Sequence, residues 1–214
     1  KSIGFSINTI KKLEGAVVEI IHMYIILSID CLCGSISFCG FSTNVNIKSI
    51  LLWILAFGIQ GATEEIMCRG FLLNSLKNRI SIPLAILISS TAFVFPHLSS
   101  LNEADLVYAV VGIVNLYLVS ITFSILVLWR SNIWIACGLH SAWNFILYVI
   151  MGLSLSGSES VSKGVVLFSV KDASILNGAE YGIEASVITT VVLGMLLFVM
   201  VKGWKGRIGK DGIS

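Results

Sequence analysis

Two adjacent carboxylates and an arginine lie inside an otherwise apolar stretch, GATEEIMCRG at residues 61–70. A charged side chain at the centre of a membrane-spanning helix costs about 3 kcal/mol on insertion scales, so such residues are rare unless they face a protein interior and act there. Glu65 and Arg69 are four residues apart, which places them on one helix face where they can form an ion pair. Glu64 diverges from Glu65 by about 100° and is left without this partner. We therefore expect Glu64 to act as a general base on a water molecule.

Three further polar side chains lie deep in apolar segments: His97 in FVFPHL, and His140 and Asn144 in GLHSAWNFIL. His140 and Asn144 are also four residues apart, so they can donate to one developing oxyanion. At about 1.5 Å per helical residue, these three and Glu64 lie roughly 12 to 22 Å below the inner membrane surface. The similar depth predicts that they meet in one buried cavity, where His97 shares the attacking water with Glu64. Pro96 removes a backbone donor and is expected to kink the helix beside His97.

The elements that must position these residues are transmembrane helices. Of the 214 residues, 56% are hydrophobic and 12% are charged, and the mean hydropathy is +0.94, far from the composition of a soluble domain. Strands of a β-barrel alternate polar and apolar residues, which these segments do not, so we predict an all-α transmembrane bundle. The chain is expected to form a single domain, residues 1–214, with its core motifs within 50–151. At least six spans are predicted, at 16–38, 50–76, 82–101, 106–129, 133–151 and 185–202.

Positive charge is distributed unevenly between the predicted loops. Cytoplasmic flanks retain Lys and Arg, and the favoured topology puts ten of the 14 on the inner side and three on the outer side, with Arg69 inside the membrane. Both termini are therefore expected in the cytoplasm. The Gly- and Ser-rich segment 152–184 is predicted to be an outer loop that folds back over the bundle. The chain begins with Lys1 and not with Met, so a truncated N-terminus is expected.

The three groups of polar residues also form motifs. EEIMCR fits EExxxR, FVFPH fits FxxxH and HSAWN fits HxxxN, in that order along the chain. Together they resemble the CPBP family of intramembrane endopeptidases, which contains CAAX prenyl proteases and bacteriocin-processing proteins. The outer-loop sequences SG at 156–157 and NGAEYGIEAS at 177–186 are similar to a bacterial subset of that family. The resemblance thus implies an integral protein of the bacterial plasma membrane.

The resemblance also implies an activity and a set of roles. The activity is hydrolysis of peptide bonds in the membrane, and the matching residues are Glu64 with His97 for water activation, His140 with Asn144 for the oxyanion, and Glu65 with Arg69 as a structural ion pair. A zinc ion is the alternative, because Glu64, His97 and His140 would make a three-ligand set. The helical zinc signature HExxH is absent from the sequence, and we expect a metal-free water with no cofactor.

Other classes of function are weighed against this one. The net charge of +2 and the lack of a basic patch argue against nucleic acid as a partner. An ion-coupled transporter could use the same intramembrane charges, but no inverted repeat is visible. A non-enzymatic bacteriocin self-immunity or scaffold protein would keep every motif and stays open. On the protease reading, the expected partners are membrane lipid and a hydrophobic or lipidated peptide substrate.

Overall fold

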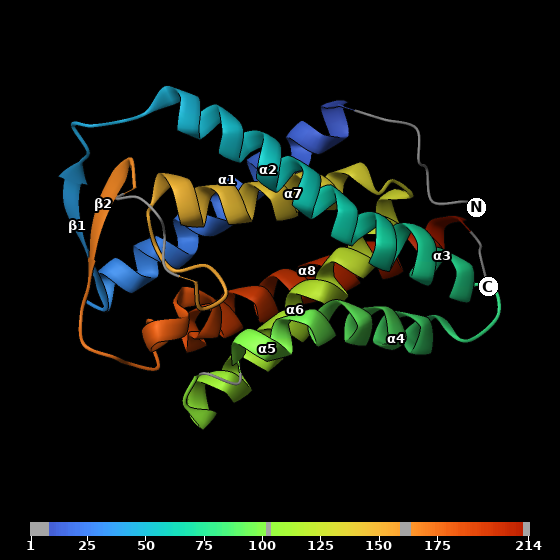
Figure 1. The fold of residues 1–214 in the computed structure, drawn as a ribbon. Helices are drawn as coiled ribbons and strands as arrows, with labels where there is room; N and C mark the ends of the chain where they lie inside the picture. The colour runs from blue at the N-terminus through green and yellow to red at the C-terminus, as the bar shows by residue number, and fades with distance from the viewer. Residues whose placement is uncertain (1–8, 102–103, 159–163, 212–214) are drawn as a thin grey trace.

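The fold is a helical bundle with one small sheet at its end (Figure 1). The computed structural model describes residues 9–101, 104–158 and 164–211. The elements in chain order are α1 (Thr9–Leu32), β1 (Ile36–Phe41), α2 (Ile47–Glu65), η1 (Ile66–Leu73), α3 (Asn74–Leu76), α4 (Ile82–Val94), η2 (Phe95–His97), α5 (Leu98–Leu101), α6 (Leu106–Arg130), α7 (Trp134–Phe145), η3 (Ile146–Ile150), β2 (Val166–Val170), η4 (Ala179–Tyr181), η5 (Ile183–Ala185) and α8 (Val187–Asp211).

The long helices form two layers. In one layer α7 packs against both α1 and α2, and in the other α6 packs against both α4 and α8 (Figure 1). Apolar side chains from α6 and α7 close the layers onto one another at one end of the bundle; they include Phe123, Val127, Ala136 and Leu139. The polar residues of the three motifs therefore lie on elements from both layers.

Five helical segments are long and apolar enough to cross a membrane: 10–32, 47–76, 82–101, 106–130 and 187–205. Segment 134–150, predicted as a sixth span, forms a shorter apolar helix of about 25 Å at 1.5 Å per residue. A hydrocarbon core is about 30 Å thick, so this helix is short for a complete crossing. The prediction of a mostly helical fold is confirmed, and the described residues contain five candidate membrane spans where six were predicted.

The first predicted span, residues 16–38, was placed too far along the chain. Helix α1 ends at Leu32, and Gly34 follows with φ +68°, a left-handed conformation that stops a helix. Strand β1 then pairs antiparallel with β2, with Ile36 opposite Val170 and a bulge between Phe38 and Gly40. The outer loop is thus partly ordered as sheet, which the prediction of a purely helical fold missed.

Two close helix contacts set the spacing of the α1, α2 and α7 layer. A Cβ on Gly138 would collide with the backbone carbonyl of Lys12, and a Cβ on Gly61 would lie 2.7 Å from Ser141 Oγ. Small residues of this kind let helix backbones approach closely in membranes. Because Ser141 follows His140, the Gly61 contact brings the start of the EExxxR motif beside the HxxxN motif.

Two irregular turns lie next to the motifs. Residues Ile66–Leu73 form a π-helix that continues α2, and π-turns inside helices are frequent at functional sites. The expected interruption at Pro96 is present, because α4 ends at Val94 and a short 3-10 turn carries the chain through His97 into α5. Both turns re-aim side chains that a straight helix would place elsewhere.

The start of α1 and the end of α8 lie at the same end of the bundle (Figure 1). This agrees with termini on one side of the membrane, while the cytoplasmic assignment stays a prediction from the charge count. Residues 1–8 and 212–214, and residues 159–163 of the predicted outer loop, lie outside the described residues.

Candidate active site

The EExxxR motif forms a buried ion pair that is anchored to a third helix. Arg69 Nη1 lies 2.9 Å from Glu65 Oε1, and neither side chain is exposed. Arg69 Nη2 donates to the Ser120 hydroxyl at 2.6 Å and to the Ser120 carbonyl at 3.0 Å, which ties η1 to α6. The guanidinium also stands 4.6 Å from the centre of the Phe93 ring on α4. The buried charge is therefore compensated by an acid, by α6 acceptors and by an aromatic face.

The same glutamate oxygen reaches the HxxxN motif. His140 Nδ1 lies 3.0 Å from Glu65 Oε1, across 75 residues of sequence. A carboxylate paired with arginine only accepts hydrogen bonds, so Nδ1 carries the proton and donates it to Glu65. The neutral ring then presents a lone pair at Nε2, and only the imidazolium form donates there. Glu65 thus fixes the orientation and tautomer of His140, a role that sequence reasoning did not assign.

Glu64 lies on the other side of this imidazole and is partly open. Its Oε2 stands 3.8 Å from His140 Nε2, and its side chain is 28% exposed. Gln60 Nε2 donates to the second carboxylate oxygen, Oε1, at 3.2 Å. A separation of 3.8 Å is too long for a direct hydrogen bond and allows one oxygen atom to bridge the two groups. Glu64 and His140 are therefore spaced to hold a water between them.

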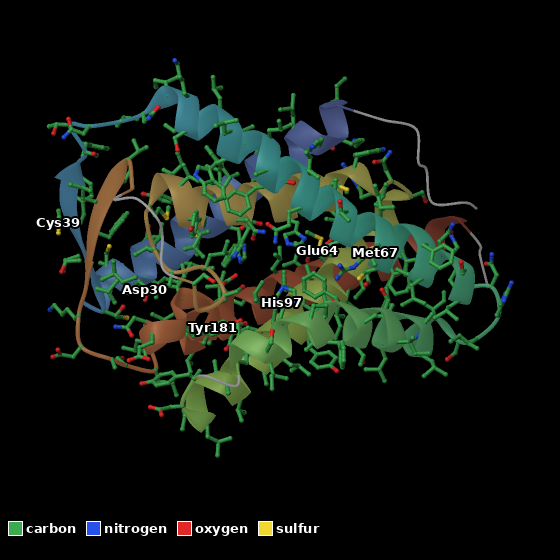
Figure 2. The ribbon with its side chains drawn as sticks, in the orientation of Figure 1. Asp30, Cys39, Glu64, Met67, His97 and Tyr181 are labelled. Carbon is green, nitrogen blue, oxygen red and sulfur yellow. The ribbon has the colours of Figure 1, made fainter. Side chains whose placement is uncertain are left out.

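His97 faces this pair from the opposite layer (Figure 2). Its Nδ1 makes a 2.9 Å hydrogen bond with the Phe93 carbonyl, one turn earlier. A carbonyl can only accept, so Nδ1 again carries the proton. His97 Nε2 is then the free nitrogen. Among the interactions of the described residues, none joins Glu64 directly to His97.

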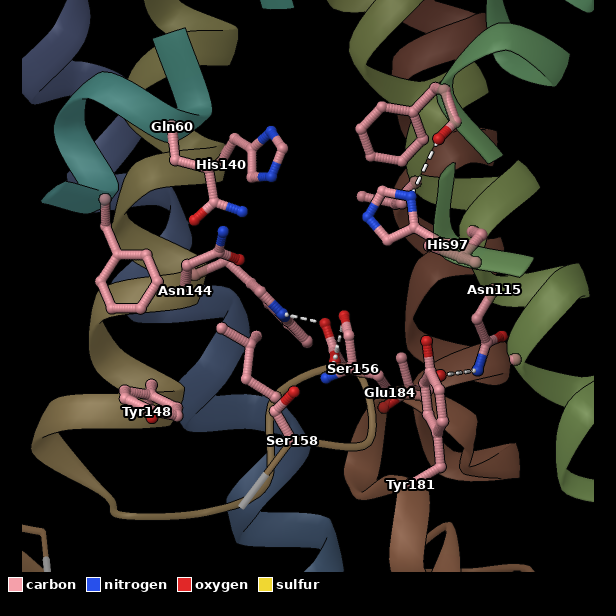
Figure 3. Close-up of a pocket in the computed structure, with 18 of the residues that line it drawn as sticks. Gln60, His97, Asn115, His140, Asn144, Tyr148, Ser156, Ser158, Tyr181 and Glu184 are labelled. Atoms are coloured by element: carbon pink, nitrogen blue, oxygen red, sulfur yellow. Dashed lines mark hydrogen bonds between the residues drawn. The ribbon is translucent and has the colours of Figure 1, made fainter. Parts of the chain in front are cut away.

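A cavity of about 340 Å³ lies between the two helix layers. His97, His140 and Asn144 line it (Figure 3), whereas Glu64 is not part of its lining and contacts two residues that are, Gln60 and His140. Much of the remaining wall is apolar and aromatic; it includes Trp53, Phe57, Phe93, Leu116, Phe123 and Tyr148. The structure thus brings three of the four predicted catalytic residues to one cavity and the fourth next to it.

The other end of the cavity carries polar groups that the motifs did not predict. Glu184 accepts from Trp143 Nε1 at 2.8 Å and from the Ser156 backbone N–H at 2.5 Å, and all three residues line the cavity. Burial raises the pKa of the Tyr181 hydroxyl, and the charge of Glu184 raises it further. Segment 177–186 was noted only for its similarity to the bacterial subset of the family, and no functional residue was predicted within it.

Asn115 fastens this end of the cavity to α6. Its amide donates to the carbonyls of Glu184 at 2.8 Å and Ser186 at 3.0 Å, and it accepts from the Thr190 hydroxyl at 2.7 Å. The side chain is buried and lines the cavity. One amide therefore fixes η5 and the first turn of α8 against the cavity wall.

The alternative metal set was tested against this arrangement. Within residues 9–101, 104–158 and 164–211, no group of three or more His, Cys, Asp or Glu side chains is gathered to hold a metal ion. Glu64 and His140 approach one another, but His97 stands across the cavity (Figure 3). As arranged, the three predicted ligands Glu64, His97 and His140 are not gathered around one point and do not fit a metal ion.

Comparison with known proteins gives a family assignment for the motif-bearing segment. The family model described as type II CAAX prenyl endopeptidase Rce1-like matches residues 46–146. No curated protein and no solved structure matches the chain. The matched segment starts at the N-cap of α2 and ends just after α7, so it contains all three motifs. Residues 46–146 thus match an Rce1-like type II CAAX prenyl endopeptidase domain, in agreement with the resemblance of the motifs to the CPBP family.

Proposed function

We propose that the chain is an intramembrane endopeptidase that hydrolyses peptide bonds of membrane-associated peptides or proteins. The observation that carries this proposal is the 3.8 Å separation of Glu64 Oε2 and His140 Nε2 beside the cavity. It places a carboxylate without an arginine partner where a water oxygen can sit within reach of both groups. The family assignment of residues 46–146 supports the same reaction class.

The first step is attack of water on the carbonyl carbon of the scissile bond. Glu64 removes one proton from the water as its oxygen forms the new C–O bond. Gln60 holds the other carboxylate oxygen and so limits the rotation of Glu64. His97 Nε2, the nitrogen of that ring that is left to accept, lies across the cavity, and its hydrogen bond to the same water forms when the two layers draw together around the substrate. Two groups from two layers therefore orient one nucleophile.

The negative charge that develops on the carbonyl oxygen is met by His140 and Asn144. The Asn144 amide can donate in every state, whereas His140 Nε2 donates when the ring is imidazolium, a form that the Glu65 carboxylate favours. Collapse of the intermediate breaks the C–N bond, and the proton held by Glu64 passes to the leaving nitrogen. The products are one new carboxylate and one new amine.

The substrate class follows from the surroundings of the site. The cavity wall is largely aromatic and aliphatic, and the helices that form it expose large apolar side chains on their outer faces. A peptide that already partitions into the membrane reaches such a site without a large desolvation cost. We therefore propose hydrophobic or lipidated peptides as substrates.

The test uses purified protein with a panel of prenylated and unprenylated hydrophobic peptides, with products read by mass spectrometry. The wild type and Glu180→Gln, which removes an exposed carboxylate outside the cavity, are expected to cleave at equal rates. Glu64→Ala is expected to abolish cleavage. Cleavage by Glu64→Ala at the wild-type rate would overturn the mechanism, and failure of the wild type on every peptide would favour a scaffold.

A chelator arm separates the metal-free mechanism from its alternative. Cleavage that is indifferent to the chelator agrees with water activated by Glu64 alone. Cleavage that is lost with the chelator and restored by zinc would overturn that mechanism while leaving the endopeptidase activity in place.

A further inference from the structure

Glu184 puts a single negative charge into the cavity at the end away from Gln60 and His140 (Figure 3). Among the described residues that line the cavity, no lysine or arginine is present, and Glu184 is the only carboxylate. In a site with mostly apolar walls, charges act on one another more strongly than in water. A charged substrate group that enters here therefore meets an uncompensated carboxylate.

The hydrogen bonds of Glu184 fix the position of its carboxylate and leave one of its acceptor positions open. Oε1 accepts from the Trp143 indole, and Oε2 accepts from the backbone N–H and the hydroxyl of Ser156. Two of these donors, the indole and the backbone N–H, can only donate, a pattern that suits an ionised carboxylate. A carboxylate offers about four acceptor positions, so one position on Oε1 stays open after these three bonds.

Glu184 is linked to the catalytic residues through their own helix. Trp143, which positions Oε1, is the direct neighbour of Asn144 on α7. Glu184 and Asn144 line the same cavity, so the acid lies within the few residues of substrate that flank a bond held at the proposed oxyanion site. Glu184 also lies outside residues 46–146, the segment that matches the family model.

From this arrangement we propose that Glu184 is a specificity-determining residue that binds a lysine or arginine side chain of the substrate near the cleaved bond. The inference rests on the proposed endopeptidase function and narrows its substrates to membrane-associated peptides with a basic residue in that register. A substrate carboxylate, including a free C-terminus, is disfavoured at the same place because the two negative charges repel. The site thus selects an internal basic segment over an acidic or terminal one.

The test is a peptide series that differs at one position at a time. N-acetylated, C-amidated hydrophobic peptides carry Lys, its uncharged isostere norleucine, or Glu at each position flanking the cleaved bond. For the wild type we expect one position at which kcat/KM is about tenfold or more higher for Lys than for norleucine, and lower still for Glu. Equal rates across the series, or a preference for Glu, would overturn the inference and leave the endopeptidase function standing.

Substitutions of Glu184 test whether this residue causes the preference for Lys over norleucine. Glu184→Gln is expected to reduce the Lys to norleucine ratio to below about twofold, while the control Glu180→Gln keeps the wild-type ratio. A ratio unchanged in a folded Glu184→Gln protein would overturn the assignment. Glu184→Asp, which keeps the charge on a shorter side chain, is expected to retain a preference for Lys over norleucine.

Binding gives a readout that does not need catalysis. Fluorescent versions of the same peptides are titrated into Glu64→Gln protein in lipid nanodiscs. We expect the Lys peptide to bind about tenfold more tightly than the norleucine peptide, and this difference to vanish in Glu64→Gln/Glu184→Gln. Equal binding of the two peptides by Glu64→Gln would overturn the inference, whether or not any peptide is cleaved by the wild type.

Discussion

Glu64 and Glu65 are neighbours in the chain and lie in opposite surroundings. Glu65 has no exposed side-chain surface, and one of its oxygens receives both the guanidinium of Arg69 and the imidazole of His140. Glu64 is 28% exposed, receives one bond from the neutral amide of Gln60, and has no arginine. One carboxylate is compensated and fixed, and the other is open and available.

The difference shows how one helix turn can serve structure and chemistry together. A buried ion pair is stabilising only while every partner is present, because removing one leaves an uncompensated charge. A general base needs the opposite, an oxygen that is free to take a proton. We expect changes around Glu65 to act on folding and changes around Glu64 to act on rate, and five variants test that division.

The largest effect is expected for Glu64→Gln. The amide cannot take the proton from water, so cleavage is expected to fall by about 10²- to 10⁴-fold. Because the side chain is partly exposed and keeps a neighbour in Gln60, the melting temperature should stay at the wild-type value. Rates and thermal melts of the same preparation check both parts, and a variant that melts earlier and still cleaves would reverse the division.

Next is Arg69→Ala, which removes the partner of a fully buried acid. We expect a loss of about 3 to 5 kcal/mol in the free energy of unfolding, because Glu65 is left uncompensated. Denaturant unfolding in detergent measures the loss. If this variant extracts and melts like the wild type, the buried pair contributes nothing to folding.

A double variant separates the two partners of Glu65. Glu65→Gln with Arg69→Met removes both charges, so part of the stability lost in Arg69→Ala is expected to return. Activity is not expected to return, because a neutral amide no longer favours the imidazolium form of His140; a reduction of about 10- to 100-fold is typical for such supporting residues. Full recovery of cleavage would show that Glu65 acts only through the ion pair.

The smallest effects distinguish the two supporting side chains. Ser120→Ala removes one hydrogen bond to Arg69 and is expected to cost about 1 kcal/mol of stability without changing the rate. Gln60→Met removes the bond to Glu64 and is expected to lower kcat/KM by a few fold with stability changed by less than about 0.5 kcal/mol. When both variants are measured, Ser120→Ala should change the free energy of unfolding and Gln60→Met should change kcat/KM.

Several features of the site could be predicted because they depend on local periodicity. The four-residue spacing of Glu65 and Arg69 predicts their contact, and the equal spacing of His140 and Asn144 predicts a shared face. Apolar segment length predicts most of the spans. The position of Pro96 predicts the break beside the FxxxH histidine. These inferences need only the geometry of a helix.

Other features depend on contacts between distant parts of the chain. The bond between Glu65 and His140 joins α2 to α7 across 75 residues of sequence, a contact that no local rule contains, so the roles of Glu65 were only half predicted. The strand Ile36–Phe41 exists because β2 pairs with it from far along the chain, and local hydropathy alone extended α1 through it. Glu184 reaches the cavity through the fold of the outer loop, which composition described only as polar.

The π-helix at Ile66–Leu73 has a consequence for how this sequence tolerates changes in length. A π-turn accommodates one more residue than an α-turn, so it shifts the angular phase of everything that follows relative to everything before. Deleting one residue from this segment can be absorbed by a return to an ordinary α-turn, whereas inserting one rotates the two halves of the helix by about 100° against each other. The side chains of Glu64 and Glu65 could then not keep their present directions while η1 kept its packing against α4. We therefore expect this stretch to accept many substitutions on its exposed side and no insertion.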